Sequence, residues 1–418
     1  MQVPFFVQAT LKKIFPGFAG FYRRSRSHWH TPRTRYTDAP RRFAELVDQI
    51  NDTPFDRVQK DEFRLALEHD TAKRAESASA FIEINNTCNI DCLMCMTSLT
   101  TREKGRMSAD VLELAVQRAV AAGAREVELH TLGDPLANPR LADVFAVLRR
   151  HGVRTGLSTN GLLLHRHVDT LIEFVDVCSS ISFSIDGATA STYEHIRAGG
   201  NWDRLITNLN IARDRLSPSG FRLRSSMVVS RDNVHEVGAY ITLLRRYVTD
   251  PRLDVHLGVI NSLSPDNTYF DATNLFANHT YQNLPCHMVS GRTPHTLIDG
   301  RVSVCSRDYD GSLVVGDIRH DTVADIMNGD SMRALQNAHA TGDVSAYPMC
   351  ATCFTIDSRV PAAINELTAY LLYFFPDEPA EFYQSRIDQC VSMFQQGADA
   401  SVTAALFPTP TTGRSANN

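Results

Sequence analysis

The stretch AFIEINNTCNIDCLMCMTS, residues 80–98, decides how the rest of the sequence is interpreted. Its first six residues are mostly apolar and predict a β-strand, and the loop that follows places Cys88, Cys92 and Cys95 in a CxxxCxxC pattern. Three thiolates in eight residues can reach three corners of one iron–sulfur cubane. No fourth cysteine lies nearby, so one iron would be left open to an outside ligand. The alternatives are zinc, for which a structural site needs four closed ligands, or cysteines kept for packing.

Around this stretch, the sequence alternates between strand-like and helix-like segments. Strands separated by helices of about 10–15 residues imply parallel βαβ units and therefore an α/β fold. Six units are too few for a closed eight-stranded barrel, so an open sheet or partial barrel fits, with function at the C-terminal ends of the strands. Strands are expected at residues 80–85, 125–130, 153–158, 180–185, 221–229 and 253–259, and helices at 107–123 (N-cap Ser108), 141–151, 162–174, 202–216 and 233–247.

The cysteine loop resembles the cluster-binding loop of the radical S-adenosylmethionine superfamily, whose catalytic domain is a partial (βα)6 barrel. The family usually has an aromatic residue before the third cysteine, where this sequence has Met94, which keeps an apolar cover over the cluster. The resemblance implies a [4Fe–4S] cluster whose open iron binds S-adenosylmethionine. It also implies reductive cleavage of that cofactor to a 5′-deoxyadenosyl radical, which takes a hydrogen atom from a substrate carbon.

Three further segments resemble the cofactor-binding motifs of the same family. HTLGDPLANP resembles the Gly-Glu-Pro turn whose backbone meets the amino group of S-adenosylmethionine, with Gly133 and the shorter Asp134 in the first two places. LSTNG places Asn160 where the family contacts the ribose. SFSIDG and the following TYEHIRAGG place Ser184 at the ribose or carboxylate and Arg197 at the carboxylate, which suits the bidentate fork of arginine. The Asp-Gly pair after Ser184 is expected to form a turn.

Four more cysteines, Cys286, Cys305, Cys350 and Cys353, lie in the C-terminal third of the sequence. Residues 297–305 predict a β-hairpin that turns at an Asp-Gly pair, a short strand is expected in SLVVGDI, and residues 321–340 predict one helix before the final CxxC. Residues 284–356 resemble twitch, the short form of the SPASM extension. The resemblance implies an auxiliary [4Fe–4S] cluster closed by four thiolates; a zinc ribbon is the alternative.

Beyond these motifs, residues 1–42 hold nine Lys or Arg and one acid, interleaved with aromatic residues. We expect an arm that packs its aromatic side chains on the main domain; contact with anionic lipid or an acidic partner is the alternative. Residues 367–375 predict a helix face docked on the barrel. The expected domains are 1–78 (this arm and a helical extension), 79–262 (radical SAM partial barrel), 263–356 (auxiliary-cluster domain), 357–407 (C-terminal helices) and 408–418 (disordered tail).

Composition limits the remaining function classes. The formal net charge of −5 provides no global basic field for nucleic acid. Nine cysteines are too few for a disulfide scaffold in 418 residues, and no apolar run approaches the roughly 18 residues that a membrane span needs. The N-terminus lacks the basic-then-apolar order of a secretory signal. We therefore expect a cytoplasmic protein. The resemblance implies an enzyme that acts on a small molecule and takes electrons from a donor such as flavodoxin or ferredoxin.

The resemblance implies a reaction class as well. A fully ligated auxiliary cluster can accept one electron, which favours oxidation of a small polar, sugar- or cyclitol-like substrate, as in a cyclitol-amine dehydrogenase with similarly ordered auxiliary cysteines. The alternatives are a sugar epimerase with Cys390 as hydrogen donor, a maturase of a ribosomal peptide, and a non-catalytic iron–sulfur or zinc scaffold. No catalytic base can be assigned, because His256, Asn261 and Asp308 are candidates only by their positions at strand ends.

Overall fold

The computed structural model describes residues 79–262, 268–357 and 359–397. Within these ranges the chain forms one nine-stranded sheet, in the order β10-β9-β8-β1-β2-β3-β4-β5-β6, and one two-stranded sheet, β11-β7. Strands β1 to β6 are all parallel, which confirms the expected partial (βα)6 barrel. These strands are β1 (Ser79–Ile82), β2 (Glu126–Glu128), β3 (Arg154–Thr159), β4 (Cys178–Ser184), β5 (Arg222–Val229) and β6 (Val255–Val259).

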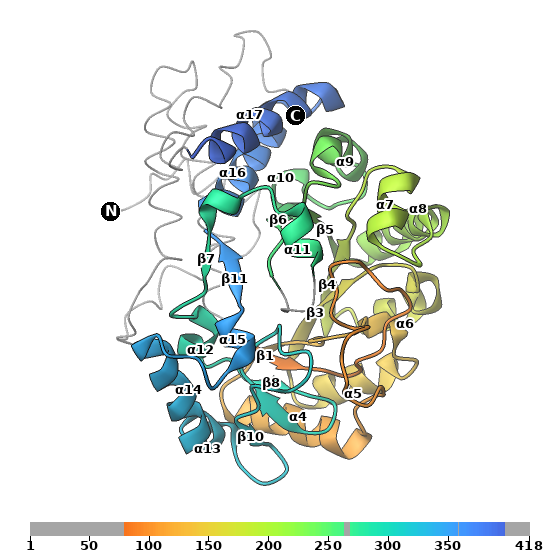
Figure 1. Ribbon diagram of the computed structural model, residues 1–418. Coiled ribbons are helices and arrows are strands. Elements are labelled where there is room, and N and C mark those ends of the chain that lie inside the picture. The colour runs from red at the N-terminus through yellow and green to blue at the C-terminus, as the bar shows by residue number, and fades with distance from the viewer. Residues whose placement is uncertain (1–78, 263–267, 358, 398–418) are drawn as a thin grey trace, which may run out of the picture.

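The helices between these strands cover the outer face of the curved sheet (Figure 1). Burial alternates along β5, whose Leu223 and Met227 are fully buried while their neighbours are half-buried. This period-two pattern places apolar residues against the helices and polar residues on the inner face. The covering helices are α4 (Ala109–Ala121), α5 (Leu141–Arg150), α6 (Val168–Glu173), α7 (Ala190–Ile196), α8 (Trp202–Ile211), α9 (Val237–Leu244) and α10 (Pro251–Asp254).

Several helices differ from the sequence expectation at their ends. The expected helix at 162–174 begins as a separate 3₁₀ turn, and the one at 202–216 ends in a π-helical segment. The helix at 233–247 also begins as a 3₁₀ turn, because Asn233 donates its side-chain amide to the carbonyls of Val228 and Asp186 and so fixes the turn after β5. Ser108 does cap α4, accepting from the backbone of Val111.

The segment that follows the barrel, residues 268–356, begins with α11 and continues as an auxiliary unit, residues 280–356. Its first strand in the main sheet, β8 (His295–Thr296), pairs in parallel with β1 and then forms the expected hairpin with β9 (Arg301–Ser303). The helix expected at 321–340 is two helices, because Gly329 ends one and begins the next. The other elements here are α11 (Tyr269–Thr273), β7 (Thr280–Gln282), α12 (His287–Gly291), β10 (Gly316–Asp317), α13 (Val323–Met327), α14 (Asp330–Thr341), α15 (Pro348–Ala351) and β11 (Phe354–Ile356).

Two C-terminal helices, α16 (Arg359–Phe374) and α17 (Ala380–Gln395), pack beside β6 and α9 (Figure 1). The backbone N–H of Leu257 in β6 donates to Asn365 Oδ1 at 2.8 Å, and Asn365 Nδ2 donates to the carbonyl of Leu257 at 2.5 Å. The amide thus satisfies the open edge of β6 as a further strand would. No helix within the described ranges has the length and apolar character needed to cross a membrane.

Replacing Asn365 by Ala should therefore weaken the docking of α16 on the barrel. The substitution leaves one donor and one acceptor of Leu257 without partners, and we expect a loss of about 1–3 kcal/mol in the free energy of unfolding. Urea denaturation followed by circular dichroism measures it. The matched control is Asn337→Ala on the exposed face of α14, where a change within about 0.5 kcal/mol is expected. Equal effects at both positions would contradict the assigned role of Asn365.

Candidate functional site

The three cysteines of the CxxxCxxC loop lie together directly after β1, at the C-terminal edge of the barrel. The loop is held by backbone bonds from Asp91 to Ala198 and from Leu93 to Ile196. Burial raises the pKa of Cys88 to about 12, and the neighbouring Asp134 carboxylate and cysteine thiolates add to it; burial raises that of Cys92 to about 11. The buried thiols of Cys88 and Cys92 need a cationic partner to ionise, and an iron–sulfur cluster fits this set of three cysteines.

The predicted cofactor residues converge on this loop from the neighbouring strands. Asn160 Nδ2, after β3, lies 3.6 Å from Cys88 Sγ, and Arg197 Nη1, after α7, lies 3.6 Å from Cys92 Sγ. Gly133 has a positive φ of 77°, and a Cβ there would stand 2.6 Å from the carbonyl oxygen of Thr87. Only glycine allows the turn after β2 to approach the cysteine loop this closely.

Ser184 and Asp134 are two further residues that were predicted to bind the cofactor. Ser184 ends β4, is half-buried, and pairs across the sheet with Ser226. Asp134 is buried, and its carboxylate accepts hydrogen bonds from Thr159 Oγ1, from the backbone N–H of Asn160 at 2.7 Å and from that of Leu136. Burial raises the pKa of Asp134, and these hydrogen bonds oppose the rise. The carboxylate thus joins the turn after β2 to the end of β3 and positions Asn160.

A buried ion pair that the motifs did not suggest fixes Arg197. Asp186 is fully buried; its Oδ1 accepts from the backbone of Val228 at 2.7 Å, and its Oδ2 lies 2.7 Å from Arg197 Nε. The Nε–H does not point at that oxygen, so the contact is an ion pair without a hydrogen bond. Burial alone would lower the pKa of Arg197, but Asp186 and Cys92 outweigh it and raise the pKa. The guanidinium is therefore a fixed positive charge beside the cysteine loop.

Glu83 is a second residue that the motif analysis missed. It is fully buried and accepts two hydrogen bonds of 2.7 Å from the guanidinium of Arg102, and the backbone N–H groups of Leu132 and Ile298 also donate to it. One carboxylate thus connects β1, the cysteine loop, the turn after β2 and the auxiliary unit. A lone acid in the otherwise apolar segment AFIEIN was the available signal, since buried carboxylates are nearly always paired.

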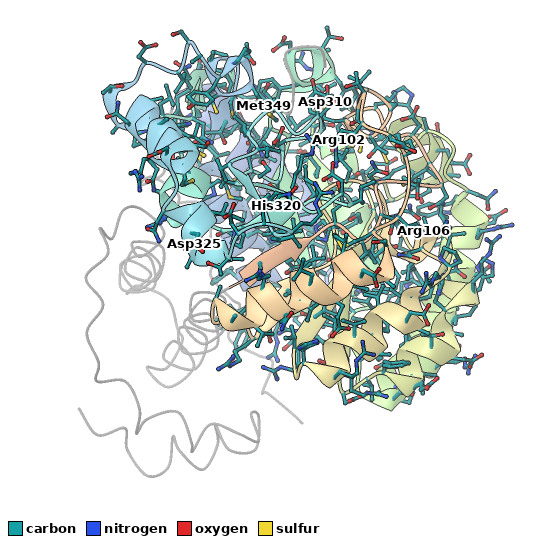
Figure 2. The ribbon with its side chains drawn as sticks, turned by 90° about the horizontal axis from the view of Figure 1, so that it is seen from below. Arg102, Arg106, Asp310, His320, Asp325 and Met349 are labelled. Atoms are coloured by element: carbon teal, nitrogen blue, oxygen red, sulfur yellow. The ribbon has the colours of Figure 1, made fainter. Side chains whose placement is uncertain are left out.

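Arg102 extends this connection into the auxiliary unit. Its Nε donates to the carbonyl of Tyr309 at 2.8 Å, and the adjacent backbone N–H of Thr101 donates to Asp310 Oδ1 at 2.7 Å. Figure 2 shows Arg102 and Asp310 close together where the loop and the auxiliary unit meet. The position of the cysteine loop is therefore coupled to that of the auxiliary unit.

Glu83→Gln should be among the most destabilising conservative changes in the barrel. It leaves the buried guanidinium of Arg102 without a counter-charge, for which we expect a loss of about 3–5 kcal/mol. Thermal unfolding of the cluster-free chain measures it. Glu126→Gln, which breaks the exposed pair with Arg154 at 3.3 Å, is the control and should cost less than about 1 kcal/mol. If Glu83→Gln unfolded at the same temperature as this control, Glu83 would not be the residue that holds the interface.

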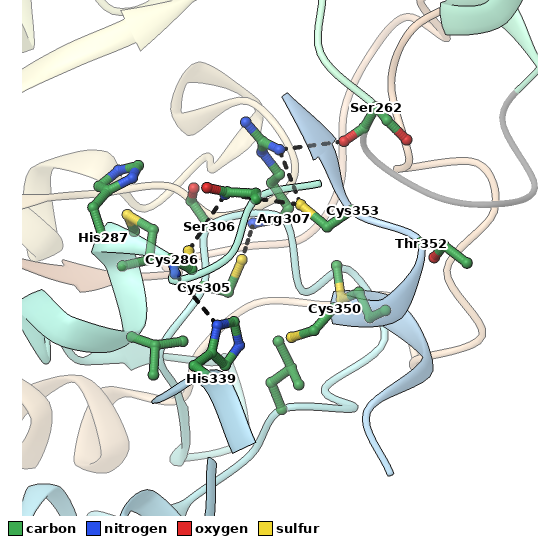
Figure 3. Close-up of a pocket in the computed structure, with 15 residues that line it drawn as sticks. Ser262, Cys286, His287, Cys305, Ser306, Arg307, His339, Cys350, Thr352 and Cys353 are labelled. Atoms are coloured by element: carbon green, nitrogen blue, oxygen red, sulfur yellow. Dashed lines mark hydrogen bonds between the residues drawn. The ribbon is translucent and has the colours of Figure 1, made fainter. Parts of the chain in front are cut away.

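The four cysteines of the second group line one partly open cavity of about 100 Å³ (Figure 3). They come from four separate places: the start of α12, the end of the β8–β9 hairpin, α15, and the residue before β11. Burial raises the pKa of Cys305 and of Cys350 to about 12, and the other cysteines of the group add to both shifts. The four sulfurs that line the cavity belong to Cys286, Cys305, Cys350 and Cys353.

A closed set of four thiols fits a fully ligated [4Fe–4S] cluster. In the described ranges, no three His, Cys, Asp or Glu side chains have the geometry of a site for one metal ion. Asn283 Nδ2 donates to Cys286 Sγ at 3.4 Å, and the backbone N–H of Arg307 donates to Cys305 Sγ at 3.4 Å. The sulfurs are thus supplied with the hydrogen-bond donors that thiolate ligands of a cluster require.

The structure also places the three candidate bases. Asp308 is fully buried and accepts from Ser303 Oγ and from the backbone of Leu313, so its carboxylate is bound within the loop after Cys305. Asn261 donates to the carbonyl of Val259 and accepts from Thr355 Oγ1. His256 is exposed on β6. Asp308 and Asn261 therefore have structural partners, and strand-end position alone did not identify a base.

The two lone cysteines lie apart from these groups. Cys178 is the first residue of β4 and is fully buried. Cys390 is fully buried in α17, a helix that packs on α9 and α16. The expectations for residues 1–78, including contact of the basic arm with lipid, and for the tail at 408–418 fall outside the described residues.

Comparison with known proteins agrees with this geometry. Residues 82–244 match the radical SAM superfamily, and residues 286–354 match the SPASM iron–sulfur cluster-binding domain. Mycofactocin maturase MftC of Mycobacterium tuberculosis is 27% identical over 166 residues, which are 40% of this chain and 41% of that protein. GTP 3′,8-cyclase of Synechocystis is 26% identical over 175 residues, 41% of this chain and 51% of that protein. The chain thus spans about half or less of the length of these relatives.

Two solved structures also align with this chain at low sequence identity. BtrN in complex with AdoMet and 2-DOIA aligns with a TM-score of 0.45 and 15% identity, over 66% of this chain and 92% of that one. SuiB of Streptococcus suis bound to the precursor peptide SuiA aligns with a TM-score of 0.49 and 11% identity, over 78% and 79%. The cofactors of the two matched domains are [4Fe–4S] clusters and S-adenosylmethionine. The chain belongs to the radical SAM superfamily and carries a SPASM iron–sulfur cluster-binding domain.

Proposed function

We propose that the cysteine loop holds the cluster that binds S-adenosylmethionine and that the four cysteines of the auxiliary unit hold a second cluster. The convergence of Asn160 and Arg197 on the loop supports the first assignment. The cavity closed by four sulfurs supports the second. The proposed ligands are Cys88, Cys92 and Cys95 for the first cluster, and Cys286, Cys305, Cys350 and Cys353 for the second.

Residues around the loop are proposed to bind different parts of the cofactor. Arg197, fixed by Asp186, is suited to bind the cofactor carboxylate, because it is charged and its donors face the loop. The backbone at Gly133 offers carbonyl oxygens to the amino group, while Asp134 positions Asn160 for the ribose. Ser184 is proposed as a second ribose or carboxylate contact from β4. When bound, the cluster and S-adenosylmethionine supply a 5′-deoxyadenosyl radical by reductive cleavage.

The proposed reaction is a two-electron oxidation of the substrate. The substrate loses a hydrogen atom to the 5′-deoxyadenosyl radical, a proton to a base or water, and one electron to the auxiliary cluster, so that an alcohol becomes a ketone. The observation that carries this proposal is the cavity lined by four cysteines, because four thiolates would ligate every iron of a cubane and favour electron transfer as its role. The first electron is proposed to come from a donor such as flavodoxin or ferredoxin.

A small polar, sugar- or cyclitol-like substrate fits the inner face of the barrel. Ser158 in β3 pairs with Ser182 in β4, and Ser184 pairs with Ser226 in β5, all of them half-buried. Most of their neighbours along the strands are buried apolar residues, and the exceptions, Thr159 and Ser225, are buried polar residues. A row of hydroxyl groups at this face favours a substrate with hydroxyl or amino groups of its own.

A ribosomal peptide is the second candidate substrate, because the curated relatives that this chain matches include a mycofactocin maturase. Sugar epimerisation is less well supported. It needs a hydrogen donor, and Cys390 lies buried in a helix that packs on the outer layer. Another residue of this chain, at the inner face of the barrel, would have to donate the hydrogen atom.

The test uses the full chain purified without oxygen, with iron and sulfide measured first and about eight irons expected. Deuterated cyclitol amines, deuterated sugar alcohols and a deuterated precursor peptide are then compared with dithionite as reductant. Deuterium in 5′-deoxyadenosine together with a small product that has lost two hydrogens supports the proposal. If deuterium reached 5′-deoxyadenosine only from the peptide, the result would support the second candidate substrate, a ribosomal peptide. A product with no added unsaturation, in which a solvent-derived hydrogen replaces the transferred deuterium, would overturn oxidation in favour of epimerisation.

A further inference from the structure

Arg307 lies between the barrel and the auxiliary cysteines. Its Nη1 donates to Cys353 Sγ and to the carbonyl oxygen of Ser262, both at 3.3 Å (Figure 3). Its backbone N–H donates to Cys305 Sγ at 3.4 Å. One residue therefore contacts two of the four sulfurs and also reaches the segment after β6, at the edge of the barrel where the parallel strands end.

The positive charge of Arg307 is directed at sulfur and is not neutralised by a partner. No Asp or Glu in the described ranges forms an ion pair with it, in contrast with Arg197, which is paired with Asp186. The side chain is half-buried, so water screens its field less than at the surface. Asn283 is the other side-chain donor at this site, at 3.4 Å from Cys286 Sγ and 3.9 Å from Cys353 Sγ, and it is neutral.

A charged donor at a cluster thiolate has a defined effect on redox chemistry. The cluster gains a negative charge when it is reduced, and a nearby cation or hydrogen bond to sulfur stabilises the more negative state. We infer that Arg307 raises the reduction potential of the auxiliary cluster and so makes it the electron acceptor of the reaction. This inference rests on the proposed function, in which that cluster takes the electron from the substrate.

The position of Arg307 also favours this role over a general structural one. A residue that only joined two domains would need the bond to Ser262, but its side chain would not need to donate to a cluster sulfur as well. Arg307 is a tuning residue in this scheme: it contacts sulfur ligands and is not proposed to contact the substrate. The neutral Asn283 is expected to contribute in the same direction, with a smaller effect because its hydrogen bonds carry no net charge.

The experiment is a redox titration of the full chain loaded with both clusters, followed by electron paramagnetic resonance. S-adenosylmethionine is added to shift the signal of the first cluster and so separate the two. Arg307→Gln should hold about eight irons but show a lower midpoint potential for the auxiliary cluster, whereas Arg307→Lys should stay close to the unaltered chain. Arg319→Gln, which removes an exposed arginine paired with Asp317, is the control and should change nothing.

The outcomes separate this inference from the proposed function. Equal potentials in Arg307→Gln and the unaltered chain, with full iron, would overturn the tuning role and leave the oxidation proposal standing. About four irons in the unaltered chain would overturn both. Should Arg307→Gln fail to retain its iron, Arg307→Met replaces it as the uncharged variant with a similar apolar stem. A lowered potential in the Lys variant as large as in the uncharged one would contradict the role of charge.

Discussion

Cys92→Ala is expected to reduce cleavage of S-adenosylmethionine to the background of the reductant alone and to remove about four of about eight irons. Cys92 is the most buried of the three loop cysteines, and Arg197 lies against its sulfur. Two remaining thiols cannot hold a cubane with one open iron, so the position to which the cofactor binds is lost. The measurement is 5′-deoxyadenosine formed under dithionite, together with iron per chain.

Cys178→Ala provides the matched control for this variant. Cys178 is also a buried thiol of the barrel, but it begins β4, at the end of the strands opposite to the loop. It should retain all iron and full cleavage activity, with at most a modest loss of stability. If Cys92→Ala still cleaved the cofactor, the assignment of the loop would be wrong. If the unaltered chain formed no 5′-deoxyadenosine at all, the enzyme proposal would fail, and a non-catalytic scaffold would be left.

The barrel could be predicted from the sequence because its signals are local. Each strand segment is short and contains buried apolar residues, helical segments separate consecutive strands, and parallel order follows from that alternation. The cysteine loop and the turns at Gly133 and Asn160 lie at strand ends, so their convergence followed from the fold once the strands were in order. The hairpin before Cys305 was likewise marked by its Asp-Gly turn.

Contacts between distant segments could not be predicted in this way. The pairing of β8 with β1 joins the auxiliary unit to the barrel sheet, but two residues of strand carry no periodic signal. Glu83 and Arg102 form their pair across a loop, and Arg307 reaches a sulfur 46 residues further along the chain. The partner of such a side chain is set by the three-dimensional structure. The residues next to it in the sequence do not reveal which distant residue it contacts.

The same reasoning explains why the sequence could not reveal the hydrogen-bond partners of Asp134 and Asp308. Each is an acid near a candidate site, and a sequence offers no measure of how many donors surround a carboxylate. In the structure, backbone N–H groups and hydroxyls occupy both carboxylates. An acid at a strand end can therefore hold a loop in place instead of acting in catalysis. The number of hydrogen-bond donors around its carboxylate distinguishes the two roles.

Cys350→Ala is expected to separate the two halves of the proposed reaction. Cys350 is buried in α15 and lines the auxiliary cavity, so the variant should lose the second cluster and keep about four irons. The first cluster lies on the barrel loop, which this change does not touch, so cleavage of S-adenosylmethionine should continue. The oxidised product should fall to background, because the substrate radical has no electron acceptor and can only return to substrate or decay.

This double result is what distinguishes an electron acceptor from a structural cluster. If the auxiliary cluster had only a structural role, its loss would loosen the fold. Cofactor cleavage and product formation would then fall together, because Arg102 and Glu83 couple the loop to the auxiliary unit. Cys390→Ala is the control, because it removes an equally buried thiol from α17 and should leave both readouts unchanged. Product formed at the unaltered rate in Cys350→Ala, with only about four irons measured, would show that the electron leaves the substrate by another route.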